Sequence, residues 1–120
     1  MKRYIHASIN PWVQELVDQV AKRYDLLYVT PEADYVLRGD SFAFKVNDHN
    51  VYRAIVDLRE GRLYLQCIAV AWYDDQGKEH YDEAVDYKDE VVEYSKMLDT
   101  LVKWVNECEA EDSEFTEYED

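Results

Sequence analysis

Glycine and proline are scarce in this sequence, with 3 Gly and 2 Pro among 120 residues. The three glycines are isolated from one another, so they cannot form the glycine-rich loop that holds phosphate groups in nucleotide-binding proteins. The sequence also lacks the Gly-x-Ser-x-Gly elbow of serine hydrolases and the His-Glu-x-x-His motif of zinc proteases. Because the common catalytic motifs are missing, we expect a protein without enzymatic activity.

Cysteine is also scarce, and its two positions are Cys67 and Cys108. Two cysteines are too few for the disulfide framework of a small secreted protein, which favours reduced thiols in a cytoplasmic protein; one bridge between them is the alternative. Cys67 lies in an apolar run, where a thiol is buried and inert. His6, His49 and His80 lie far apart in the sequence and are interpreted as edge or solvated residues. We expect no metal site and no cofactor.

Long hydrophobic runs are absent. The longest weakly polar stretch, residues 63–73, is broken by Gln66 and is far shorter than the ~20 residues that a membrane-spanning helix needs. The first residues turn polar before any apolar run of signal-peptide length. We therefore expect no membrane association and a cytoplasmic location.

Positive charge is nearly missing from residues 71–120. Four lysine charges minus eighteen carboxylates give −14 there, which equals the net charge of −14 for the whole chain. A magnitude of ~2–8 is enough for solubility, and a larger one-sided charge destabilises a fold through self-repulsion. Direct binding to nucleic acid or to an anionic membrane needs basic residues, so neither is expected. The charge instead indicates a basic partner protein.

The N-terminal third predicts a strand, a helix and a second strand. The first strand is expected at residues 3–7. Asn10 is a favourable helix N-cap and Pro11 suits the first helical position, so a helix should follow and end near residue 25. Residues 26–30 form an apolar run that predicts the second strand, and residues 35–37 are a further stretch that can pair.

The middle of the chain predicts an antiparallel meander, with strands expected at residues 41–46, 51–58, 62–73 and 78–87. Polar turns at residues 47–50, 59–61 and 74–77 join them. Alternation places Tyr52, Ala54, Val56 and Leu58 on the core face of one strand. Residues 62–73 are apolar on both faces, which predicts a central strand.

From about Asp89 the apolar spacing becomes helical, with a stripe at Val91, Tyr94, Leu98, Leu101, Val105 and Cys108. We expect this helix to dock on the sheet; a coiled-coil seam is the alternative. Residues 110–120 are acidic and poor in apolar side chains, which predicts a disordered tail. The expected fold is thus one α+β domain over residues 1–109, in which a sheet of about four or five strands packs with an N-terminal and a C-terminal helix.

The acidic residues of the second half fall into three groups. Those at the helix start are favoured by the helix dipole, by ~0.3–1 kcal/mol each, and those in the tail aid solubility. The strand over residues 78–87 has no such explanation, because it has little apolar surface to bury, and interleaved tyrosines there can stack on arginines. The expected partner-binding residues are Asp74, Asp75, Glu79, Tyr81, Asp82, Glu83, Asp86, Tyr87, Asp89, Glu90 and Glu93.

A calcium loop is a near match in the same region. With Gly77 as the sixth position, Asp74, Gln76 and Glu83 would fall at the third, fifth and twelfth positions. The first position would be Trp72, whose side chain has no oxygen, and the flanks predict strands where the motif needs helices. We therefore expect no calcium site.

Crowded carboxylates also predict a pH effect. Like charges disfavour ionisation, so the pKa values of these acids are expected to rise on folding, and the fold is expected to gain stability as the pH falls through them.

In size, acidity and abundance of Asp, Glu and Tyr, the C-terminal half resembles small inhibitor proteins of phages and mobile elements that mimic nucleic acid, the anti-CRISPR and anti-restriction proteins. The resemblance implies a non-enzymatic protein of the bacterial cytoplasm whose acidic face blocks the basic nucleic-acid-binding groove of a defence nuclease. It transfers no functional position. The alternatives are an immunity protein or antitoxin that neutralises a basic toxin nuclease, an acidic hydrolase using pairs such as Asp74/Asp75 or Asp82/Glu83, and an acidic housekeeping interaction domain.

Overall fold

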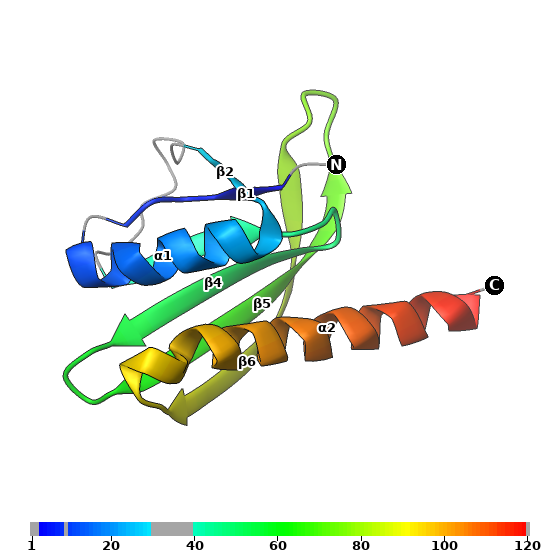
Figure 1. Ribbon diagram of the computed structural model, residues 1–120. Helices are drawn as coiled ribbons and strands as arrows, with labels where there is room; N and C mark the ends of the chain where they lie inside the picture. The colour runs from blue at the N-terminus through cyan, green and yellow to red at the C-terminus, as the bar shows by residue number, and fades with distance from the viewer. Residues whose placement is uncertain (1–2, 9, 30–39, 120) are drawn as a thin grey trace.

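A computed structural model of the chain describes residues 3–8, 10–29 and 40–119. In this part of the chain, two helices pack on one face of a six-stranded sheet (Figure 1). The predicted α+β class, with one N-terminal and one C-terminal helix, is confirmed. The pairing expected for residues 35–37 lies outside the described residues.

The strands are β1 Tyr4–Ile5, β2 Leu27–Tyr28, β3 Ser41–Lys45, β4 Asn50–Asp57, β5 Arg62–Tyr73 and β6 Glu79–Val91. Their order in the sheet is β2-β1-β3-β4-β5-β6, so β3 to β6 form the predicted antiparallel meander and β6 is an edge strand. The sheet is nevertheless mixed, because β1 is antiparallel to β3 and parallel to β2. The helix between β1 and β2 explains the parallel pair, since parallel neighbours need a crossover connection.

Helix α1, Pro11–Tyr24, begins and ends where the sequence predicts. The Asn10 side chain accepts a hydrogen bond from the backbone N–H of Trp12 at 3.0 Å, and Pro11 occupies the first turn. Asp25 closes the helix in the left-handed region at φ 55°, and its N–H donates to the carbonyl of Ala21. Aspartate tolerates this conformation better than most residues because its side chain is short and polar.

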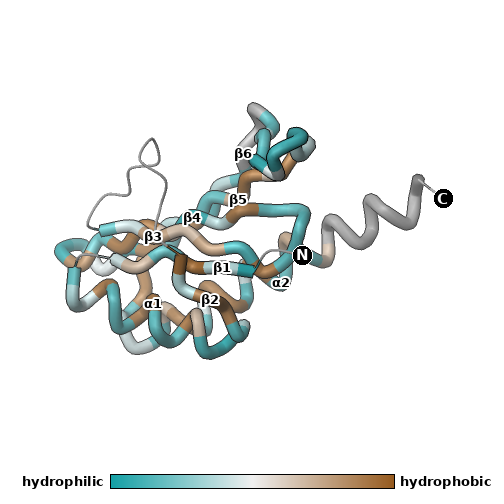
Figure 2. Tube along the Cα trace, turned by 90° about the horizontal axis from the view of Figure 1, so that it is seen from above, coloured by the Kyte–Doolittle hydropathy of each residue, from teal (hydrophilic) through white to brown (hydrophobic). Residues whose placement is uncertain are grey.

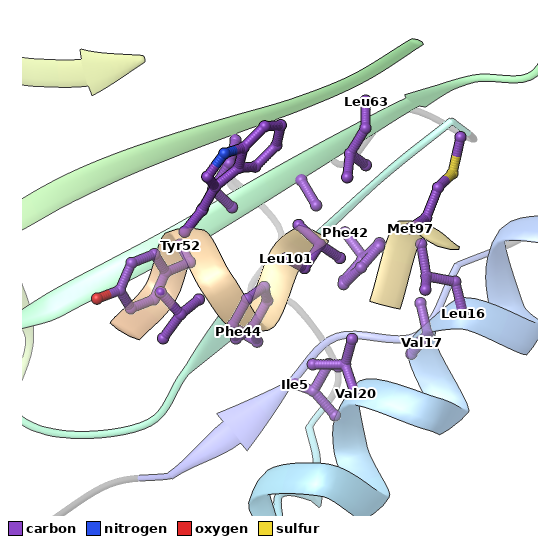
Figure 3. Close-up of a cluster of buried hydrophobic side chains, with 14 of the residues drawn as sticks. Ile5, Leu16, Val17, Val20, Phe42, Phe44, Tyr52, Leu63, Met97 and Leu101 are labelled. Carbon is purple, nitrogen blue, oxygen red and sulfur yellow. The ribbon is translucent and has the colours of Figure 1, made fainter. Parts of the chain in front are cut away.

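One hydrophobic core joins both helices to the sheet (Figure 3). The register of β3, β4 and β5 places their buried side chains on one face, so that Phe44 lies opposite Tyr52 and Tyr52 opposite Cys67. The Phe44 and Tyr52 rings stack with centroids 5.4 Å apart. The predicted core face of β4 is confirmed for Tyr52, Ala54 and Val56, whereas Leu58 lies in the turn after β4 and is exposed.

The C-terminal helix begins later than the sequence predicts. β6 continues to Val91, a 3-10 turn spans Tyr94–Lys96, and α2 runs over Met97–Glu119. The expected helix start at Asp89 is therefore wrong, and Asp89 and Glu90 are strand residues. Asp89 pairs with Tyr64 and Glu90 pairs with Leu63, so both extend the β5–β6 ladder. The spacing of apolar residues along the chain cannot predict this pairing between strands.

The rest of the apolar stripe packs as expected. Leu101, Val105 and Cys108 are buried in the core, which confirms that α2 docks on the sheet, while Val91 leaves the stripe and is 62% exposed. Residues 110–119, predicted as a disordered tail, have a helical backbone that continues α2. Low apolar content predicts disorder, but glutamate and alanine also favour helix, and composition cannot separate the two.

The β5–β6 hairpin bends at two irregularities in its register. Between the pairs Ile68–Val85 and Val70–Tyr81, residues 82–84 of β6 face Ala69 alone. Extra residues in one strand bend it and increase its twist, and the hairpin tip projects from the rest of the sheet (Figure 2). The strict alternation of side chains assumed along residues 78–87 is therefore wrong.

Candidate functional site

The residues predicted to bind a partner divide between two places in the hairpin. Asp74, Asp75, Glu79 and Tyr81 lie at or near its tip, and Asp86, Tyr87, Asp89 and Glu90 lie along the free edge of the sheet. Asp82 and Glu83 belong to the bulge between these places, and Glu93 directly precedes the 3-10 turn. The side chain of Glu83 lies outside the part of the chain that the structure describes.

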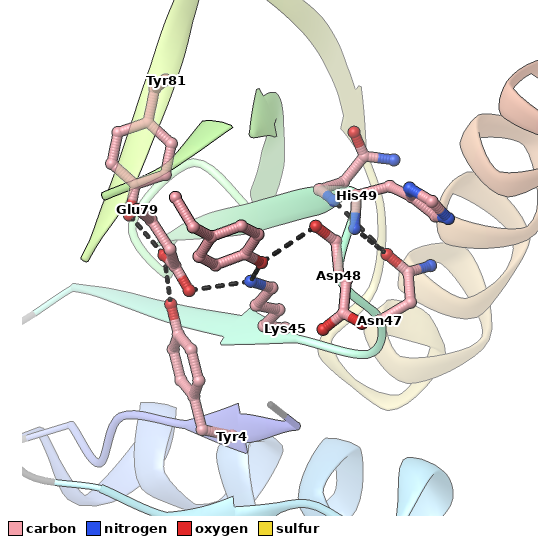
Figure 4. Close-up of polar contacts among 9 residues, drawn as sticks. Tyr4, Lys45, Asn47, Asp48, His49, Glu79 and Tyr81 are labelled. Atoms are coloured by element: carbon pink, nitrogen blue, oxygen red, sulfur yellow. Dashed lines mark hydrogen bonds and ion pairs between the residues drawn. The ribbon is translucent and has the colours of Figure 1, made fainter. Parts of the chain in front are cut away.

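Glu79 anchors the hairpin tip to the sheet (Figure 4). Its carboxylate lies 2.8 Å from the ammonium group of Lys45, and the side chains are 11% and 0% exposed respectively. Tyr81 donates a hydrogen bond to the same carboxylate at 2.7 Å, and Tyr4 donates another at 3.4 Å. Lys45 also donates to the hydroxyl of Tyr73, whose hydroxyl donates to the backbone carbonyl of Asp48 at 3.0 Å. Glu79 is therefore committed to the fold.

The pKa directions of this pair agree with an intact ion pair. Burial acts to raise the pKa of Glu79, but the hydrogen bonds from Lys45, Tyr81 and Tyr4 and the charge of Lys45 outweigh it and lower the pKa. Burial acts to lower the pKa of Lys45, and Glu79 and Tyr73 outweigh it and raise the pKa. Both groups are therefore held in their charged forms.

Asp74 serves the turn that closes the hairpin. Its carboxylate accepts hydrogen bonds from the backbone N–H groups of Gln76 and Lys78, both at 2.9 Å. It also lies 3.1 Å from His80, whose ring stacks on Trp72 with centroids 3.8 Å apart. The backbone bond from Lys78 is the largest of the effects that lower the pKa of Asp74. The flanks of this turn are strands, as the sequence predicts, whereas the calcium loop of the helix–loop–helix motif lies between helices.

The edge strand β6 presents different residues to its two sides. Asp86, Lys88 and Glu90 lie opposite Cys67, Leu65 and Leu63, so their side chains are on the face that α2 covers. Tyr87, Asp89 and Val91 are on the other face, where neither described helix packs. Near the C-terminal end of β6, Lys88 pairs with Glu107 of α2 at 2.9 Å, and Asp89 pairs with Arg62 of β5 at 2.8 Å.

Five of the predicted acids remain after these assignments. They are all exposed, and no cation among the described residues lies within ion-pair distance of them. We call them the unpaired carboxylates: Asp75, Asp82, Asp86, Glu90 and Glu93. Glu93 has no side-chain capping bond to the turn that follows it. The helix-dipole explanation given for Glu90 also fails, since this residue is in a strand.

The pKa rise expected from crowding is wrong where the structure resolves a carboxylate shift. The pKa values of Asp74, Glu79 and Glu107 are all lowered. For Glu107 the main cause is the hydrogen bond from Lys88. Each of these acids has its own donor, and that local bond outweighs the more distant negative charges.

Two residues that sequence reasoning missed, Lys45 and Glu109, hold the structure together. Lys45 is the last residue of β3, whose other residues are also buried. Its apolar neighbours in the sequence were the only signal that could have predicted its burial. Glu109, assigned to the end of the domain, accepts hydrogen bonds from the hydroxyl of Tyr52 and the side-chain amide of Asn47. Burial first, and then the Glu109 carboxylate, raise the pKa of Tyr52.

The cysteines and His6 are buried within the fold. Cys67 and Cys108 are buried thiols and not a disulfide, and His6 is buried with Nδ1 2.7 Å from the carbonyl of Val29. The described residues contain no group of three or more His, Cys, Asp or Glu side chains placed to hold a metal ion. Neither helix in these ranges has a stretch long and apolar enough to cross a membrane.

Comparison with known proteins finds no match to this chain among family models, curated proteins or solved structures.

Proposed function

We propose that this protein is a non-enzymatic inhibitor that binds a basic partner protein through the unpaired carboxylates. In the manner of the nucleic-acid-mimicking anti-CRISPR proteins that its composition resembles, it occupies the basic groove of a bacterial defence nuclease and so excludes nucleic acid. The binding surface runs from Asp75 at the hairpin tip, along the bulge and the outer edge of β6, to Glu93.

One observation carries the proposal. The acids that the fold uses each have a partner, as Glu79 has Lys45, whereas the unpaired carboxylates have no cation among the described residues. Exposed like charges destabilise the folded protein and add nothing to its packing. A basic partner would neutralise them, and this gain would appear only in the complex.

Exposed tyrosines alternate with these acids along β6. Tyr81 precedes Asp82, and Tyr87 follows Asp86 on the opposite face of the strand, so a partner that grips the edge from both faces meets both. Tyrosine rings can stack on the guanidinium groups of arginines. Tyrosine and arginine are also the residues most often found at the centre of protein interfaces. A groove that binds phosphates through arginines would therefore meet both charge and aromatic contacts here.

The test begins with capture of a partner from a bacterial lysate at low salt on the immobilised protein, with elution by a salt gradient. The captured protein is then purified, and its binding to a fluorescent DNA duplex is measured as this protein is added. We expect stoichiometric loss of DNA binding and a complex that weakens steeply with salt, because ion pairs between exposed groups are screened. A complex that survives ~1 M salt unchanged, or that leaves DNA binding intact, would contradict the proposal.

A matched pair of variants locates the surface. The triple variant Asp82→Asn/Asp86→Asn/Glu90→Gln removes three charges from it. The control Asp25→Asn/Glu60→Gln/Asp99→Asn removes three exposed charges from other parts of the molecule. We expect the first to lose capture and the second to retain it. Equal loss in both would show that only the net charge matters.

A further inference from the structure

The outer edge of β6 is long, and no described strand pairs with it. β6 has thirteen residues, Glu79–Val91, and among the described strands it pairs with β5 alone. An edge strand presents unpaired backbone N–H and C=O groups that can template another strand, and proteins usually protect such edges. What can pair with this edge depends on which groups point outward and on the side chains beside them.

The register identifies the outward groups. The N–H of Val92 donates to the carbonyl of Gly61 at 2.8 Å, just beyond the pair formed by Val91 and Arg62. Residues in an antiparallel ladder alternate between pairs that bond to each other and pairs that do not. Glu90, Lys88 and Asp86 therefore bond toward β5. The N–H and C=O groups of Tyr87, Asp89 and Val91 point to the open side.

The edge carries charged side chains and adjoins a bulge, which limit pairing to a complementary strand, but two of its three outward residues are uncharged. Tyr87 and Val91 favour strands, are 68% and 62% exposed, and lie on the face that neither described helix covers. Neither is a lysine or a proline, the residues that commonly block an edge. The exposed apolar area on this strand is thus available to a partner strand.

Charge decides which strand can pair. Residues 86–91 carry Asp86, Asp89 and Glu90 against Lys88 alone, and Lys88 and Asp89 are already in ion pairs. Pairing of β6 with the β6 of a second copy would set acidic residues against acidic residues, and like charges across strands are destabilising. A basic strand would instead lie beside Asp86 and Glu90.

We propose that β6 accepts a basic, extended segment of the partner protein as a seventh strand. The segment bonds to the backbone of Tyr87, Asp89 and Val91. It places lysines or arginines beside Asp86 and Glu90, and apolar side chains against Tyr87 and Val91. Its sequence therefore alternates basic and apolar residues. This inference rests on the proposed function and adds how the partner is held.

The test uses a synthetic eight-residue peptide of alternating arginine and valine, with a control peptide in which the four arginines precede the four valines. Amide hydrogen exchange of the full chain is followed by NMR with each peptide. We expect the alternating peptide to protect the amides of Tyr87, Asp89 and Val91 and to bind about tenfold more tightly than the control. The same amides are also followed without peptide at increasing protein concentration. Protection that grows with the protein concentration would show self-pairing and overturn the proposal.

Two substitutions separate backbone from side chain. Tyr87→Ala removes the ring and keeps the outward N–H, while Tyr87→Pro also removes the N–H, which an edge strand tolerates on its open side. We expect Tyr87→Pro to bind the alternating peptide about tenfold more weakly than Tyr87→Ala. If Tyr87→Pro does not fold, Val91→Pro repeats the test at the end of the strand.

The outcomes separate the two proposals. Salt-sensitive binding of both peptides with equal affinity, and no protection at the three amides, would overturn the added strand and leave the acidic surface standing. The added strand would also be overturned if a captured nuclease needs the unpaired carboxylates but binds Tyr87→Pro as well as Tyr87→Ala. Failure of the triple variant to change capture would count against the proposed function itself.

Discussion

The ammonium group of Lys45 lies 2.8 Å from the carboxylate of Glu79, a residue 34 positions later in the chain. Lys45 is fully buried at the end of β3, and Glu79 begins β6 at the projecting hairpin. The pair therefore fixes how the acidic hairpin sits on the sheet. Farther along β6, Asp86 and Glu90 are positioned by their pairing with Cys67 and Leu63 of β5.

Removing one partner of this pair should be costly. Glu79→Ala leaves the Lys45 charge buried without its carboxylate, and breaking a buried pair on one side typically costs about 3 kcal/mol. The double variant Lys45→Met/Glu79→Leu should recover most of that loss, because it leaves no buried charge. Urea unfolding measures both, with Asp75→Asn as an exposed control. A single variant within ~0.5 kcal/mol of the unmodified protein would show that water compensates the lysine.

Stability should fall at acid pH. The pKa of Glu79 is lowered on folding, so the unfolded chain takes up its proton first and the contribution of this group is present above its ordinary value of 4.5 and lost below it. The pKa of Lys45 is raised, so its contribution is lost only as the pH rises above 10.5. Urea midpoints measured from pH 7 to pH 3 should decrease, and Glu79→Gln should flatten the decrease. A midpoint that rises toward pH 4 would instead show that repulsion between crowded carboxylates raises their pKa values on folding.

Local signals in the sequence predicted α1 from its N-cap at Asn10 to its end, and the turns of the meander set the register of β3 to β5. The end of β6 was mispredicted because Asp89 and Glu90 pair with residues far back in the chain. The bulge at residues 82–84 and the Lys45–Glu79 pair are also contacts between distant segments. Alternation along one strand could therefore locate the acidic hairpin but could not sort its acids into paired and unpaired ones.

The unpaired carboxylates should make the protein more stable in salt. With no described cation beside them, Asp82, Asp86 and Glu90 repel one another and the acids of α2, and salt screens that repulsion. The triple variant Asp82→Asn/Asp86→Asn/Glu90→Gln should gain roughly 0.5 kcal/mol at low salt and nothing at ~1 M salt. Thermal unfolding at both salt concentrations measures this. The control Asp25→Asn/Glu60→Gln/Asp99→Asn should gain less, and an equal gain would mean that the repulsion is spread over the whole surface.

Tyr52→Phe tests how α2 is held against the end of the sheet. The hydroxyl of Tyr52 is buried in the core and donates to Glu109, which Asn47 also contacts. Phenylalanine keeps the stacking with Phe44 but leaves Glu109 without this donor, and a hydrogen bond to a charged group contributes about 1.5–3 kcal/mol. We expect a loss near the lower value in urea unfolding, since Asn47 still donates. Tyr87→Phe, which removes the hydroxyl of a 68% exposed ring, is the control and should lose less. If both variants lose equally, Glu109 is satisfied by water and the C-terminal part of α2 is held by apolar packing through Val105 and Cys108 alone.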